Sequence, residues 1–134
     1  MILTIRPDRQ RAKSLKVMAE TTLKRLQSTD IYCYPANTLT DYYDIIHKLM
    51  ESLLYIGGYR IKGEGAHKEL IDFACSEYGL SEQSRRFLQQ LREYRNRIAY
   101  EGFFIKSDYI MMHSEEINSI VLRLIRKLEE KFVK

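Results

Sequence analysis

Residues 40–58 read TDYYDIIHKLMESLLYIGG, and this stretch decides the fold. Its large apolar side chains recur every three or four residues, which places them along one face of an α-helix. They are Tyr42, Ile46, Leu49, Leu53 and Ile56. Thr40 and Asp41 are residue types that cap a helix start, and Gly57-Gly58 suits its end because glycine adopts left-handed turns. The stretch therefore predicts an amphipathic helix with a broad apolar face.

The same period recurs in four other segments, which span about residues 7–27, 66–78, 81–102 and 114–132. Whether the last helix begins near Ser107 or near Ser114, which can cap it, stays open because residues 109–112 fit either start. No segment combines alternating hydrophobicity with hairpin turns, the pattern typical of strands. We therefore predict an all-α, up-and-down bundle of four to five antiparallel helices. The apolar stripes of residues 40–58, 81–102 and 114–132 are expected at its centre.

Length and composition set the class of protein. The 134 residues suit a single domain over 1–134, and 45% hydrophobic with 30% charged residues is typical of a folded chain. Two cysteines are too few for a disulfide scaffold. No apolar run is long enough for a membrane span, and the N-terminus lacks a signal-peptide core. We expect a cytoplasmic protein without membrane contact.

The net charge of +4 is unevenly distributed along the chain. Residues 1–25 carry seven basic and two acidic side chains, whereas residues 26–80 carry four basic and eight acidic ones. Residues 81–134 are again basic, with eleven basic against eight acidic side chains. Basic ends around an acidic middle permit contact with a polyanion such as RNA without requiring it.

Metal and cofactor sites are not predicted. His47, His67 and His113 stand far apart in the sequence and lack the spacing of known metal ligands. The glycine pairs lack the Gly-Lys-Ser/Thr ending of a phosphate-binding loop. At the edge of its helical stripe, His47 is expected to be a half-buried packing residue.

The strongest candidate for chemistry is residues 92–102, REYRNRIAYEG. Three arginines, Arg92, Arg95 and Arg97, can bind phosphate through their fork-shaped donors. Asn96 and Tyr100 are four residues apart and share a helix face. The alternative is a solvated basic face with Tyr94 and Ile98 buried beneath it.

Three stretches together resemble the HEPN domains of prokaryotes, small helical proteins often encoded beside minimal nucleotidyltransferases. Residues 40–49, TDYYDIIHKL, look like the family's Tyr-Tyr helix. Residues 65–71, GAHKELI, are similar to the Thr-His-rich loop that opens its third helix. Residues 95–100, RNRIAY, fall where the family has Arg-Asn, three further residues and a histidine. The resemblance covers about residues 8–132.

The resemblance implies a dimeric, metal-independent ribonuclease in the active members of the family. There the arginine stabilises charge on the scissile phosphate and the histidine transfers protons. Carried over, Arg95 and Asn96 match the motif, whereas Tyr100 stands at the histidine position. A phenol titrates near pH 10 and is a poor base at neutral pH. Gly102 stands where some members carry a nucleotide-accepting tyrosine.

Several functions remain open at this stage. The first is a homodimeric binding module of a toxin–antitoxin type, which contacts a nucleotidyltransferase or RNA with little or no nuclease activity. It is favoured because Tyr100 replaces the proton-transferring histidine. The alternative is a metal-independent endoribonuclease that uses Arg95, Asn96 and Tyr100 as catalytic residues. A purely structural bundle, unrelated to nucleic acid, is the third.

Overall fold

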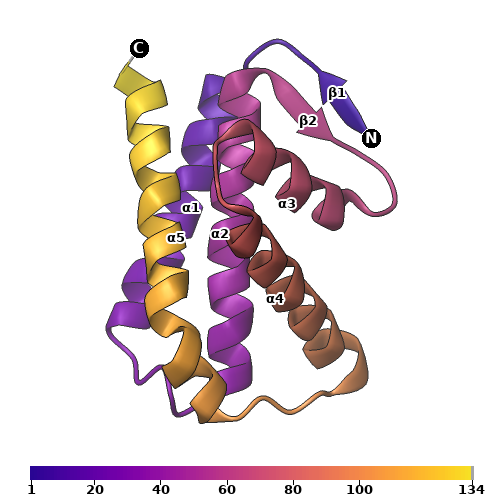
Figure 1. Cartoon of the computed structure of the whole chain (residues 1–134). Helices are drawn as coiled ribbons and strands as arrows, with labels where there is room; N and C mark the ends of the chain where they lie inside the picture. Colours follow the sequence, from indigo (N-terminus) through magenta and orange to yellow (C-terminus); the bar gives the residue numbers. More distant parts are fainter. Residues whose placement is uncertain (134) are drawn as a thin grey trace.

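The computed structural model describes residues 1–133, so Lys134 of the predicted domain lies outside the described residues. Within that range the chain forms five helices and two short strands (Figure 1). The helices are α1 (Arg9–Gln27), α2 (Pro35–Gly57), α3 (Ala66–Glu77), α4 (Glu82–Glu101) and α5 (Ser107–Val133). The strands are β1 (Ile2–Thr4) and β2 (Tyr59–Ile61). The predicted all-α helical bundle is confirmed.

Helix α2 is the centre of the bundle and packs against α1, α3, α4 and α5 (Figure 1). Its predicted apolar stripe is buried except for Ile56, which is only partly buried, and Leu49 and Leu53 have no exposed surface. The core also takes apolar side chains from the predicted stripes of α4 and α5, although Ile98 is only partly buried against it. Among the buried ones are Leu91, Val121, Leu124 and Leu128.

The start of α2 differs from the prediction, and the start of α5 answers a question that the sequence left open. Helix α2 begins at Pro35, five residues before the predicted cap at Thr40. Proline suits the first turn because its fixed backbone angle is helical and its missing N–H has no partner there. Helix α5 begins at Ser107, which decides between the two starts left open. The end of α2 is as predicted, with Gly58 in the left-handed conformation at φ 86°.

The two-stranded sheet was not predicted. Strands β1 and β2 pair antiparallel, with Leu3 opposite Arg60 and Thr4 opposite Tyr59. Three-residue strands are too short to show an alternating pattern in the sequence. The sheet holds β2 beside α2 and α3 (Figure 1). Tyr59 and Arg60 of β2 line a cavity next to the candidate site.

Candidate active site

Two histidines from different helices meet at one side of α2. His47 lies in the middle of α2 and His67 in the first turn of α3, and their ring centres are 4.1 Å apart. The Tyr43 hydroxyl lies 3.1 Å from Nδ1 of His67. Tyr43 precedes His47 by one turn and is only 2% exposed, so its position is fixed by the core. This leaves Nε2 of His67 as the nitrogen available to a ligand.

Glu51 extends this row by one further turn of α2. Its Oε1 lies 2.9 Å from Nδ1 of His47. Burial alone would raise the pKa of Glu51, but the hydrogen bond and charge of His47 lower that pKa overall. The carboxylate therefore stays ionised at neutral pH and fixes the orientation of the His47 ring. Tyr43, His47 and Glu51 thus form a polar row at four-residue spacing along one side of α2.

Arg95 of α4 faces the same row. Its guanidinium carbon lies 5.8 Å from the centre of the Tyr43 ring. The nearest carboxylate oxygen in its ion pair, Oδ1 of Asp44, is 3.9 Å away. Within residues 1–133, Nε of Arg95 is buried without a hydrogen-bond partner. A guanidinium with such loosely held donors has capacity left for an anionic ligand.

The surroundings lower the pKa of His67 and raise the pKa of Tyr43, and both shifts suit proton transfer. The pKa of His67 is lowered, first by burial and then by the nearby charges of His47 and Arg95. Burial raises the pKa of Tyr43 to about 12, although the positive charges of Arg92 and Arg95 oppose that rise. At neutral pH the site therefore holds a neutral imidazole, which can accept a proton, beside a protonated phenol.

The other residues predicted for the site lie in different surroundings. Nε of Arg92 donates a hydrogen bond to Oε1 of Gln89 at 2.7 Å. The positive charge of Arg92 is still close enough to the row to act to lower the pKa values of Tyr43 and His67. Arg97 covers the Phe103 ring at 3.9 Å instead.

Asn96 is half-buried, whereas Tyr100 is 81% exposed near the end of α4. No hydrogen bond, ion pair or ring contact within residues 1–133 joins either side chain to Arg95. The fold thus brings Arg95 to the Tyr43 ring, close enough for its charge to act on His67, rather than to Tyr100.

The histidine pair was not predicted from the sequence. His47 was expected to be a packing residue, and 20 residues separate it from His67, so nothing in the local pattern joins the two. The signal that could have found it is the polar row itself, since Tyr43, His47 and Glu51 recur on one helical face. In the described part of the chain, no three His, Cys, Asp or Glu side chains are grouped so as to hold a metal ion.

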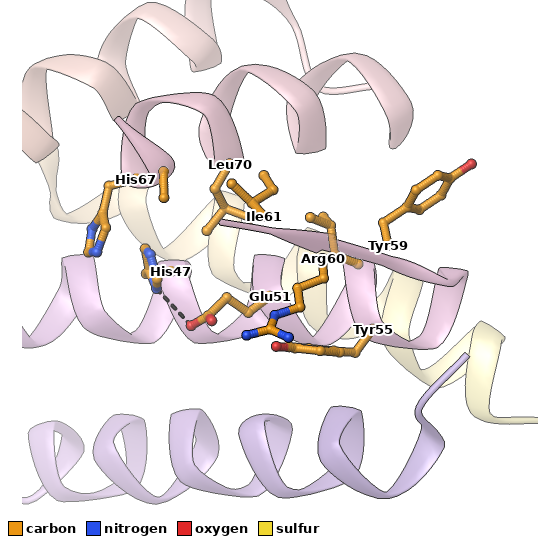
Figure 2. A pocket seen from close by; sticks show the side chains of 10 residues that line it. His47, Glu51, Tyr55, Tyr59, Arg60, Ile61, His67 and Leu70 are labelled. Carbon is orange, nitrogen blue, oxygen red and sulfur yellow. Dashed lines mark ion pairs between the residues drawn. The ribbon is translucent and has the colours of Figure 1, made fainter. Parts of the chain in front are cut away.

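A cavity of about 130 Å³ adjoins the histidine pair between α2, β2 and α3 (Figure 2). His47 and His67 stand at one end of it, and Glu51 forms part of its wall. Its other lining residues combine aromatic, aliphatic and basic side chains. They are Leu54, Tyr55, Tyr59, Arg60, Ile61, Ala66 and Leu70.

None of the helices within residues 1–133 has the length and apolar character needed to cross a membrane. Comparisons of the whole chain with protein-family models, with curated proteins and with solved structures give no match.

Proposed function

We propose that the protein is an RNA-binding endoribonuclease that needs no metal ion for catalysis. Arg95 binds the scissile phosphate, and His47 and His67 transfer protons. The observation that carries the proposal is the position of Arg95 beside Tyr43, whose hydroxyl contacts one of two adjacent imidazoles. This retains the phosphate-binding arginine of the HEPN resemblance but replaces Tyr100 with the two histidines as proton-transferring groups.

The chemistry is an attack of the RNA 2′-hydroxyl on the adjacent phosphorus. The lowered pKa of His67 leaves its imidazole neutral, so Nε2 can accept the 2′-hydroxyl proton when Nδ1–H donates to the Tyr43 oxygen. His47, whose Nδ1 lies beside the Glu51 carboxylate, is the group that gives a proton to the departing 5′-oxygen. Arg95 stabilises the charge that builds up on the phosphate oxygens. The products are a 2′,3′-cyclic phosphate and a 5′-hydroxyl end.

A binding module is the second candidate, supported by exposed apolar side chains near the α4–α5 connection. Tyr100, Phe104 and Met112 are 81%, 89% and 75% exposed. Exposed apolar patches of this kind commonly mark protein interfaces. A second copy of the chain or a nucleotidyltransferase-type partner would cover them, in the cytoplasmic, toxin–antitoxin setting that the HEPN resemblance implies.

Incubation of the purified protein with end-labelled single-stranded RNA in EDTA tests the proposal. We expect cleavage with 2′,3′-cyclic phosphate ends. His67→Asn and Arg95→Gln should each reduce the rate by about 10²–10³-fold, the range typical of lost proton transfer or lost charge stabilisation. The exposed Tyr100 provides the matched control, and Tyr100→Phe should leave the rate unchanged.

Two outcomes would overturn the proposal. A folded wild-type protein that binds RNA but never cleaves it would leave the binding module as the function. Loss of cleavage in Tyr100→Phe together with full activity in His67→Asn would return catalysis to the residues predicted from the sequence.

A further inference from the structure

The cavity beside the histidine pair has no part in the proton transfers proposed above. It shares His47 and His67 with the proposed active site and extends from them toward β2 (Figure 2). An RNA strand whose phosphate lies at Arg95 would therefore bring a neighbouring nucleotide to its mouth. The side chains that line the cavity determine which class of ligand it can bind.

The walls suit a partly apolar ligand. Leu54, Ile61 and Leu70 line the cavity with aliphatic surface. Tyr55, which is only 6% exposed, adds an aromatic ring. The guanidinium carbon of Arg11 lies 4.7 Å from the centre of that ring. Aromatic and aliphatic surfaces of this kind favour stacking of a nucleobase.

Two charged groups at the cavity offer opposite hydrogen-bonding functions. Glu51 is ionised and can only accept hydrogen bonds, and its Oε2 is not used by the contact between Oε1 and His47. Arg60 can only donate, and Figure 2 shows its guanidinium between Glu51 and the Tyr55 ring. A ligand that satisfies both must present hydrogen-bond acceptors and N–H donors next to one another.

We propose that this cavity binds a guanine base of the RNA next to the cleaved phosphate, an inference that rests on the proposed ribonuclease function. Guanine presents the acceptors O6 and N7, for which an arginine fork is the commonest specific partner. Its N1–H and amino group are donors adjacent to O6 and suit the Glu51 carboxylate. Adenine places an amino donor where O6 would be, so this donor would face the donors of Arg60.

Binding of the four nucleoside 3′-monophosphates, measured by titration with NMR detection, tests the cavity without any cleavage. We expect guanosine 3′-monophosphate to bind most tightly and to shift the signals of the His47 and His67 rings. Arg60→Ala should weaken its binding by about ten- to hundredfold, the range for one bidentate arginine–guanine contact. Lys62→Ala removes the same charge one residue beyond β2, outside the cavity lining, and should have no such effect.

Cleavage of matched RNA oligonucleotides with one guanine replaced by adenine extends the test. The wild type should prefer guanine, and Arg60→Ala should reduce that preference. Equal binding of all four monophosphates, or equal losses in Arg60→Ala and Lys62→Ala, would overturn the inference. Cleavage without base preference would defeat the inference alone, whereas selective guanine binding without cleavage would defeat the ribonuclease proposal alone.

Discussion

Replacing Arg95 with glutamine removes one positive charge from the site while keeping most of the side-chain volume. The guanidinium carbon lies 5.8 Å from the Tyr43 ring centre, and that centre lies 6.2 Å from the centre of the His67 ring. The cation is therefore at most about 12 Å from His67, the sum of those two distances. Its charge favours the neutral imidazole, so the pKa of His67 should rise when the charge is removed.

Coulomb's law gives the size of that rise. At about 12 Å, two unit charges interact with roughly 0.35 kcal/mol at a dielectric constant of 80 and roughly 1.4 kcal/mol at 20. Since one pKa unit corresponds to about 1.4 kcal/mol, the pKa of His67 should rise by about 0.3 to 1. A closer approach would make the rise larger. Low salt is needed, because at about 0.1 M the screening length is roughly 10 Å.

Titration of the imidazole proton signals by NMR measures this pKa directly and requires no substrate. Arg97→Gln is the matched control, because it removes the same charge two residues away, where the guanidinium covers Phe103 rather than Tyr43. Its effect on His67 should be clearly smaller. An unchanged or lowered His67 pKa in Arg95→Gln, or an equal rise in both variants, would refute the placement of Arg95 at the histidine pair.

Three further predictions concern the whole fold. Leu53→Ala should lower the free energy of unfolding in urea by about 2–5 kcal/mol because Leu53 is fully buried, whereas Leu122→Ala, at a half-exposed position, should cost less than about 1 kcal/mol. The pKa of His67 is lowered in the folded state, so the unfolded chain binds more protons below about pH 6.5. The free energy of unfolding should therefore fall as the pH drops from about 7 to 5. The fall should be smaller in His67→Asn. Burial raises the pKa of the Cys75 thiol to about 11, so a thiol reagent should modify only the exposed Cys33 in the folded protein and both cysteines in urea.

Helices could be predicted from the sequence because their determinants are local. The stripe from Tyr42 to Ile56 and the glycine pair that follows it identify α2 within one segment. The earlier start of α2 at Pro35 was missed because residues 28–37 are polar and aromatic without a clear period. The pairing of β1 with β2 was missed because it joins residues nearly 60 positions apart.

The site was only partly predictable because catalysis and binding depend on which helix faces meet. A motif within one helix, such as Arg95 to Tyr100, appears as a unit in the sequence, yet Tyr100 points into solvent. The partners of Arg95 come instead from α2 and α3, through the contact of His67 with Tyr43. The identity of residue 100 therefore does not decide whether the chain is catalytic. What decides it is whether the imidazoles of His47 and His67, which α2 and α3 hold together, can transfer protons to and from a bound RNA.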